Sequence, residues 1–229
     1  MGKHDEVPNQ VFIGAPWKTV RQKYEWAISE LKKSFPLSFV IVGRDNEQDA
    51  KELLEIIKEK LLSSSYAVFD ATGGNANVSL EYGFAEASEI PRALYLNIHK
   101  AGHRSSKDLP IIADLAGKKR MHYTQKARLK SLLSTFANDH PYAKRFERFL
   151  LQKFKRAKKG TKHRMRTLAL KVIHCLDDKV KVRREDIVQQ LLADHSIYKR
   201  PEIEEMLQRL HQVGLIECSV GRFSDVFIR

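Results

Sequence analysis

Short apolar runs, bounded by turn residues, alternate with helical patterns over the first 140 residues, and this alternation constrains the fold more than any other feature. It is typical of βαβ units and a mostly parallel sheet. The middle runs are apolar enough to be covered on both faces. We therefore predict an α/β fold with a five-stranded, mostly parallel, flavodoxin-like sheet and helices on both faces. The strands are expected at residues 10–14, 37–43, 66–72, 92–98 and 119–124.

The last 66 residues have a different pattern, in which helix, strand, helix, helix and hairpin follow one another. The third of these helices is expected to begin near Pro201. The order is that of a winged helix, and LQRLHQVGLIE (207–217) resembles the end of the third helix and the first wing strand of that family. We therefore predict an α/β domain at residues 1–140, a basic amphipathic linker at 141–163 and a small C-terminal winged helix domain at 164–229.

The formal net charge of +13 is concentrated in the linker. Residues 141–163 hold nine Lys and Arg against the single Glu147, a net charge of +8, whereas the parts before and after carry only +3 and +2. This segment is either a binding site for DNA or RNA or a solvated helix whose lysines keep the protein soluble. Its phenylalanines either stack on unpaired bases or pack against a domain. The helix is expected to break at Gly160, and the residues expected to bind nucleic acid are Lys153, Lys155, Arg156, Lys158 and Lys159.

The stretch SSSYAVFDATGGNANVSLEYGFAEA (63–87) places Asp70 at a strand end, just before a glycine-rich turn and a helix. In a parallel sheet, the crevice outside the carboxyl ends of the strands receives ligands, and the N-terminus of the next helix offers N–H groups to an anion. Asn77 is expected near the start of that helix, with Glu81 four residues on and on the same face. The sequence thus predicts a small-molecule pocket at this edge. The alternative is a plain turn followed by a helix in which Glu81 only interacts favourably with the helix dipole or caps the first turn.

The order Asp70, Gly73, Asn75, Asn77, Glu81, Tyr82, Gly83, Phe84, Ala85 resembles the nucleoside 2-deoxyribosyltransferase-like family and its TIR-like relatives. VFIGAPW (11–17) resembles the first strand and glycine-containing loop of that family, and DLPIIADLAGKKRMHY (108–123) resembles a late segment of the TIR-like branch, so the resemblance spans most of residues 10–138. It implies that Glu81 is the catalytic carboxylate, acting at the anomeric carbon while an N-glycosidic bond breaks. With Gly14 and Arg44, which stand at strand ends, the residues expected to bind the substrate are Gly14, Asp70, Gly73, Asn75, Asn77, Tyr82 and Arg44.

Cleavage of a C1′–N bond passes through an oxocarbenium-like state, which a carboxylate beneath the sugar stabilises or bonds covalently. True deoxyribosyltransferases have a further acid ahead of the Glu, where this chain has Asn75 and Asn77, and this argues against deoxyribosyl transfer. One hypothesis is an N-glycosidase that hydrolyses NAD or another nucleotide or nucleoside, needs no cofactor and is recruited by the winged helix. The other is a non-catalytic nucleotide sensor. In that case its winged helix binds nucleic acid or a protein. Glu202, Glu204 and Glu205 on the third helix would oppose phosphates, so a protein partner stays open beside nucleic acid.

Other function classes are disfavoured by the sequence. No segment approaches the roughly 18 uninterrupted apolar residues of a membrane span, and the first residues lack the apolar core of a signal peptide. Cys175 and Cys218 have no metal or redox spacing, and His99 and His103 have no third ligand at a familiar spacing, so no metal site is predicted. We therefore expect a soluble, cytoplasmic protein with a nucleotide or nucleoside as partner and no membrane association. Its oligomeric state stays open, and a homo-oligomer is compatible with the sequence.

Overall fold

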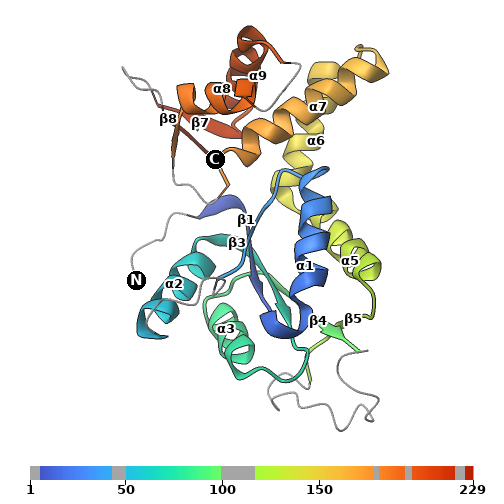
Figure 1. Ribbon diagram of the computed structural model, residues 1–229, viewed down its shortest axis with the longest axis vertical. Coiled ribbons are helices and arrows are strands. Elements are labelled where there is room, and N and C mark those ends of the chain that lie inside the picture. The colour runs from blue at the N-terminus through green and yellow to red at the C-terminus, as the bar shows by residue number, and fades with distance from the viewer. Residues whose placement is uncertain are drawn as a thin grey trace. The chain divides into compact units, whose positions relative to one another are not determined.

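The computed structural model of this chain (Figure 1) describes residues 6–42, 50–98, 117–177, 181–193, 198–219 and 225–228. The chain divides into two units with their own cores. One unit comprises Met1–Leu31 and Phe39–Phe136, and we call it the α/β unit. The other comprises Lys32–Ser38 and Ala137–Arg229, and we call it the second unit. The predicted domain boundaries at residues 140 and 163 stay predictions.

The α/β unit is built on a five-stranded sheet of order β2–β1–β3–β4–β5. The neighbours β1 and β3, β3 and β4, and β4 and β5 all pair in parallel. This confirms the five-stranded, mostly parallel sheet that the sequence predicted, and the order is that of flavodoxin-like folds. The strands are β1 (Val7–Gly14), β2 (Ser38–Val40), β3 (Ser64–Asp70), β4 (Arg92–Asn97) and β5 (Met121–Tyr123), and the helices are α1 (Trp17–Lys32), α2 (Ala50–Leu62), α3 (Ala76–Ala87) and α5 (Lys126–Asp139).

Helices cover both faces of this sheet (Figure 1), and the side chains of β3 show which face each helix covers. Because successive side chains of a strand point to opposite faces, Ala67 and Phe69 share one face, and they join the apolar cluster formed with α2 and α3. Tyr66 and Asp70 point to the other face, where Tyr66 stacks on Phe136 of α5 and Asp70 bonds to α1. The sheet is therefore buried on both sides, as its continuous apolar strands require.

The second unit begins with α6 (Pro141–Phe154), whose apolar stripe at helical spacing is buried. Phe146 and Phe149 have ring centroids 6.4 Å apart, and Phe149 packs edge-on against Phe154 at 6.0 Å. Of the two interpretations of these phenylalanines, packing within the fold is therefore confirmed. The helix starts at His140, whose side chain accepts a hydrogen bond from the Tyr142 amide, and Pro141 occupies the first turn.

The remaining elements of the second unit follow the order that the sequence predicted, namely helix, strand, helix, helix and two strands. The strands pair antiparallel in the order β6–β8–β7. The expected helix break at Gly160 is wrong, because α6 ends at Phe154 and Gly160 lies in the first turn of the next helix. The elements are α7 (Lys159–His174), β6 (Val182–Arg183), α8 (Arg184–Ala193), α9 (Arg200–Gln212), β7 (Ile216–Cys218) and β8 (Asp225–Ile228).

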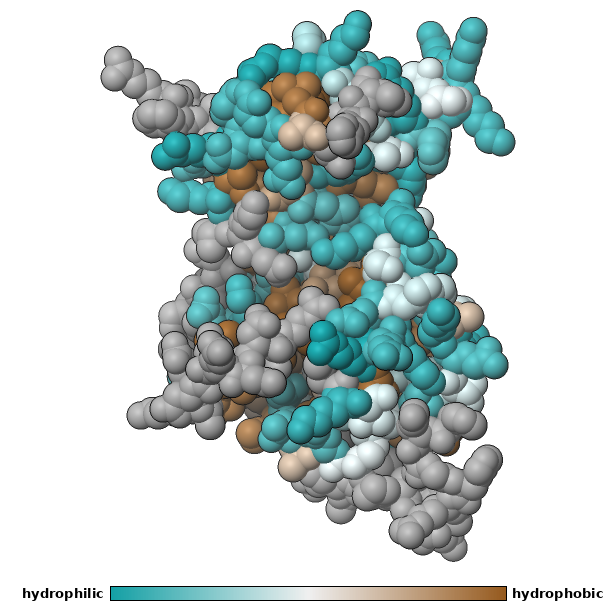
Figure 2. Space-filling model, in the orientation of Figure 1, coloured by the Kyte–Doolittle hydropathy of each residue, from teal (hydrophilic) through white to brown (hydrophobic). Residues whose placement is uncertain are grey.

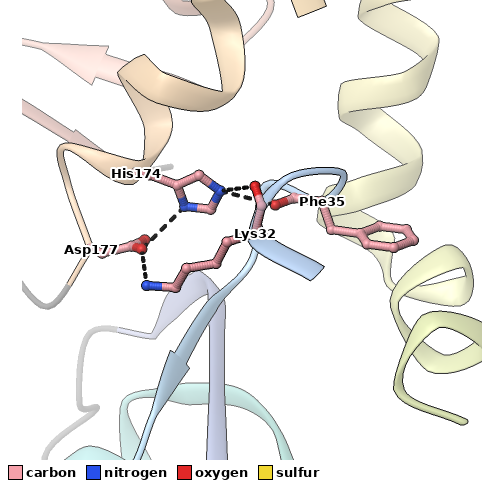
Figure 3. A network of polar contacts seen from close by, with 4 residues as sticks. All are labelled: Lys32, Phe35, His174 and Asp177. Atoms are coloured by element: carbon pink, nitrogen blue, oxygen red, sulfur yellow. Dashed lines mark hydrogen bonds and ion pairs between the residues drawn. The ribbon is translucent and has the colours of Figure 1, made fainter. Parts of the chain in front are cut away.

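A polar network at the end of α7 ties the second unit together (Figure 3). The Nδ1 atom of His174 lies 3.1 Å from a carboxylate oxygen of Asp177, and its Nε2 atom lies 3.0 Å and 3.1 Å from the carbonyl oxygens of Lys32 and Phe35. The Lys32 ammonium donates to the same Asp177 oxygen at 2.7 Å. Burial raises the pKa of Asp177, but the hydrogen bond and charge of His174, together with Lys32, outweigh it and hold that pKa below its ordinary value.

Candidate functional site

Glu81 of α3 lies directly against the end of β1, where the chain has a glycine. A Cβ atom added to Gly14 would lie 2.5 Å from the Oε2 atom of Glu81 and 2.6 Å from a ring carbon of Phe69. Both distances are shorter than carbon atoms tolerate, so any other residue at this position would displace the carboxyl group or the ring. The structure thus brings together Gly14 and Glu81, two of the residues that the sequence predicted for the site.

The carboxyl group of Glu81 is poorly solvated by its surroundings. Its Oε2 atom is buried and has no hydrogen-bond partner among the described residues. Burial raises the pKa of Glu81 from 4.5 to about 7. A buried polar atom without a partner is unfavourable for folding, and such atoms recur where a protein binds a ligand or performs chemistry. With a pKa of about 7, Glu81 exchanges its proton near neutral pH, unlike an ordinary exposed carboxyl group.

A cavity of about 100 Å³ adjoins Glu81 between α2 and α3. Apart from Glu81 and Lys58, its lining is apolar, and Leu80 at its edge is 61% exposed. A carboxyl group at the margin of an apolar cavity suits a ligand with one flat apolar part and one part that carries or develops positive charge. The lining residues are Leu54, Ile57, Lys58, Leu61, Leu80, Glu81 and Phe84.

Asp70 lies on the opposite face of the sheet from Glu81, because Phe69 occupies the Glu81 side of β3. The Asp70 carboxylate accepts hydrogen bonds from the Tyr24 hydroxyl at 3.0 Å, the Tyr123 hydroxyl at 2.5 Å, and both the amide (3.0 Å) and the hydroxyl of Thr72. Burial raises its pKa, and these hydrogen bonds oppose the rise. All four contacts are internal and connect Asp70 to α1, to β5 and to the turn after β3. The expected role of Asp70 in substrate binding stays a prediction.

The turn between β3 and α3 is shaped by two glycines and an asparagine cap. Gly73 and Gly74 have positive φ angles of 75° and 60°, a conformation that side chains disfavour. The Asn75 side chain accepts hydrogen bonds from the amides of Asn77 at 2.9 Å and Val78 at 3.4 Å, so it caps α3. The side chain of Asn77 is exposed at the first turn of α3. Gly73, Asn75 and Asn77 are thus grouped at the N-terminus of the helix that carries Glu81.

The two other residues predicted for substrate binding are placed differently. Tyr82 is buried, its ring meets Phe69 edge-on at 5.4 Å, and the Arg92 guanidinium stacks on it at 5.0 Å. It is therefore part of the core beneath Glu81. Arg44 lies outside the described residues. Sequence reasoning missed the Asp70 partners Tyr24 and Tyr123, which are 46 and 53 residues away and give no local signal.

The described part of the chain contains no cluster of metal-ligating side chains and no helix that could cross a membrane. No group of three or more His, Cys, Asp or Glu side chains there has the arrangement of a metal site. His99 and His103 lie outside the described residues. None of the described helices combines the length and apolar character that crossing a membrane requires. Cys175 and Cys218 form no disulfide in the described part of the chain.

Comparison with known proteins found similarity at the level of three-dimensional structure. No family model and no curated protein matches the chain. Among solved structures, it is similar to a 2-desoxiribosyltransferase from Leishmania mexicana, with a TM-score of 0.44 and 13% sequence identity. The match covers 58% of this chain and 99% of that one.

Proposed function

We propose that the α/β unit binds a nucleoside or nucleotide beside Glu81 and cleaves its N-glycosidic bond, with the Glu81 carboxylate as the catalytic group. The observation that carries this proposal is the buried Oε2 atom of Glu81, which has no partner among the described residues and rests on a glycine at the end of β1. The apolar cavity beside it suits the base, and the exposed Asn77 side chain in the first turn of α3 suits the sugar hydroxyls.

The chemistry follows from the charge that develops as the bond breaks. The C1′–N bond breaks, its electron pair leaves with the base, and positive charge accumulates on C1′ and the ring oxygen. An ionised Glu81 stabilises that charge or bonds to C1′. Water then attacks C1′, which releases Glu81 where it had bonded; the hydroxyl stays on C1′ and the proton goes to the departed base or, for a base that leaves neutral, to solvent, so that the net products are free base and sugar. Because Glu81 is poorly solvated in the folded chain, its attraction to the cationic centre is stronger than in water.

NAD and simple nucleosides are both candidate substrates, since each carries a base on C1′. Asn75 and Asn77 stand where an additional acid would assist departure of the base, so we propose water as the acceptor in preference to a second base. The second unit is proposed to act as a winged helix that recruits this activity to a partner. Its supporting feature is the order of helices and strands from α7 to β8.

The test is to incubate the full chain with 2′-deoxynucleosides, ribonucleosides and NAD, with and without a second free base, and to separate the products by chromatography. We expect free base from at least one substrate, and a loss of about 100-fold or more in the Glu81→Gln variant, because the amide keeps the size and removes the charge. Glu86→Gln is the matched control on the same helix, because Glu86 is exposed and pairs with Arg92 and Lys118.

Calorimetric titration with the same compounds separates the alternatives. Binding without release of base from any substrate would identify a nucleotide sensor and refute turnover. Release of base that is equal in wild type and Glu81→Gln would remove Glu81 from the mechanism. If the chain neither binds any of these compounds nor releases a base from them, the assignment of the site itself is refuted.

A further inference from the structure

A group of exposed basic side chains surrounds the passage from α6 to α7. In the part of the chain that the structure describes, none of them forms an ion pair or stacks on an aromatic ring. The sequence has no acidic residue between Glu147 and Asp177, so nothing nearby in the chain neutralises these charges. In the orientation of Figure 1, Figure 2 shows hydrophilic side chains projecting from the surface near α7. We call this group the basic segment, and it consists of Arg148, Lys153, Lys155, Arg156, Lys158, Lys159 and Lys162.

Several other basic side chains of the second unit form ion pairs with acidic side chains. Arg166 pairs with Glu147 at 2.5 Å, and Arg164 pairs with Glu202 of α9 at 2.7 Å. In these contacts a cation is held by an acidic side chain of the same unit. The basic segment has none of them among the described residues, so its charge remains available to a partner.

The helix α9, which would enter the major groove in the usual docking of a winged helix, has its own cations paired. Arg200 lies 2.5 Å from Glu185 and 3.4 Å from Glu204, and Arg209 lies 2.5 Å from Glu205. A phosphate approaching α9 would have to displace these carboxylates, which repel it. The electrostatic attraction for a polyanion therefore lies at the basic segment and not at α9.

The aromatic residues of α6 limit how the basic segment binds. Phe146, Phe149 and Phe154 are at most 7% exposed, so they neither stack on bases nor insert into a lipid layer. The first turn of α7 has no acidic residue and no side-chain cap, so its amide groups add to the positive field. The groups of the basic segment that can contact a ligand are therefore its cations and the first amides of α7, which suit the evenly spaced phosphates of a nucleic acid backbone.

We propose that the basic segment binds the phosphate backbone of nucleic acid, without reading its sequence, and supplies most of the affinity of this chain for DNA or RNA. Single strands and duplexes share this chemistry, and the test distinguishes them. The proposal is independent of any activity at Glu81.

The test measures fluorescence anisotropy of labelled 20-mers, single-stranded and duplex, titrated with the full chain between 50 and 200 mM salt. The variant replaces five cations, K153Q/K155Q/R156Q/K158Q/K159Q, all of them exposed. We expect binding at 100 mM salt to weaken by at least tenfold. The slope of log affinity against log salt should flatten by up to about 4.5 on duplex, at about 0.9 per lost phosphate contact, and by less on single strands.

A control of equal charge rules out a general effect of net charge. The variant K18Q/R21Q/K119Q/K126Q/R128Q removes five exposed cations from the α/β unit, and should keep affinity and slope within about twofold of wild type. Circular dichroism should show that both variants are folded.

Three results would overturn the proposal. The first is an unchanged slope and affinity in the basic-segment variant. The second is a larger loss in K199Q/R200Q/R209Q, which removes the cations of α9. The third is tighter binding to vesicles containing phosphatidylserine than to either oligonucleotide, which would assign the segment to a membrane surface.

Discussion

Replacement of Glu81 by Gln should stabilise the α/β unit, and the gain should grow as the pH rises. Burial raises the pKa of Glu81 from 4.5 to about 7, and unfolding restores the ordinary value. A carboxyl group with a raised pKa in the folded state contributes its full stability below the unfolded pKa, and this stability is lost as the pH rises through the folded pKa. The window for Glu81 therefore runs from pH 4.5 to about pH 7. Gln resembles the protonated carboxyl group and does not ionise, so the variant escapes this loss.

The magnitude follows from the size of the pKa change. Each pKa unit corresponds to about 1.4 kcal/mol, so a rise from 4.5 to about 7 gives an upper bound of roughly 3.5 kcal/mol for the cost of ionising Glu81 in the folded chain. The side chain as a whole is only half-buried, and water screens part of this cost. We therefore expect Glu81→Gln to raise the free energy of unfolding by about 1–3 kcal/mol at pH 8, and to leave it nearly unchanged at pH 4.5.

Urea unfolding followed by tryptophan fluorescence measures this difference. Both tryptophans of the chain, Trp17 and Trp26, belong to the α/β unit, so their fluorescence follows that unit and not the second one. Glu86→Gln is the matched control. The pKa of Glu86 is lowered, because its hydrogen bond to Lys118, together with Arg92, outweighs the opposing effect of burial, so its removal should give no gain at pH 8.

A stabilisation by Glu81→Gln that is equal at pH 4.5 and pH 8 would refute this reasoning, because it would show that folding does not change the cost of ionising this group. A destabilised variant at pH 8 would show that the ionised carboxylate has a donor that satisfies it.

Three further outcomes are expected. Gly14→Ala should lower the free energy of unfolding by about 1–3 kcal/mol, since the new methyl group collides with Glu81, and an unaffected urea midpoint would contradict the close contact. Asp70→Asn should cost about 2–3 kcal/mol at pH 7, because an amide group cannot accept all the hydrogen bonds that the carboxylate receives, and tryptophan fluorescence in urea measures it. Asp177→Asn should lower the melting temperature of the second unit at pH 7, because it removes the ion pairs with His174 and Lys32. Since the pKa of Asp177 is depressed in the folded chain, the stability from these pairs is lost as the pH falls, and the difference between variant and wild type should shrink in acid. Circular dichroism measures it, and a constant difference across pH 2–7 would contradict the prediction.

The sheet could be predicted from the sequence because buried parallel strands are continuous apolar runs between turn residues. The strand ends could not be predicted as well. The third strand was expected at residues 66–72 but ends at Asp70, because the Thr72 hydroxyl donates to Asp70 and accepts from the Asn97 amide. That exchange involves a residue 25 positions away, so no local pattern reveals it.

The candidate site could be predicted only in part, because some of its contacts join residues that are distant in the sequence. The position of Gly14 at a strand end was evident from sequence, whereas its steric role depends on a carboxyl group that arrives from α3. Asp70 was expected at the end of the third strand and lies there, while the face of the sheet to which it points follows from the alternation of β3. Phe69 belongs to the apolar face that α3 covers, so its neighbour Asp70 must face the other way.

The two carboxyl groups at this edge of the sheet therefore differ in a way that separates structure from function. Asp70 is fully buried and receives hydrogen bonds from three residues, each of which stabilises its charged form. Glu81 has a buried oxygen that no described residue satisfies, so its charged form is destabilised until something else arrives. Selection for stability alone would replace such a group, and proteins keep unfavourable arrangements of this kind where they serve a ligand or a reaction. Burial thus raises the pKa of both carboxyl groups, but hydrogen bonds to the charged form oppose that rise only at Asp70, and this difference is the reason that our proposal places the reaction at Glu81.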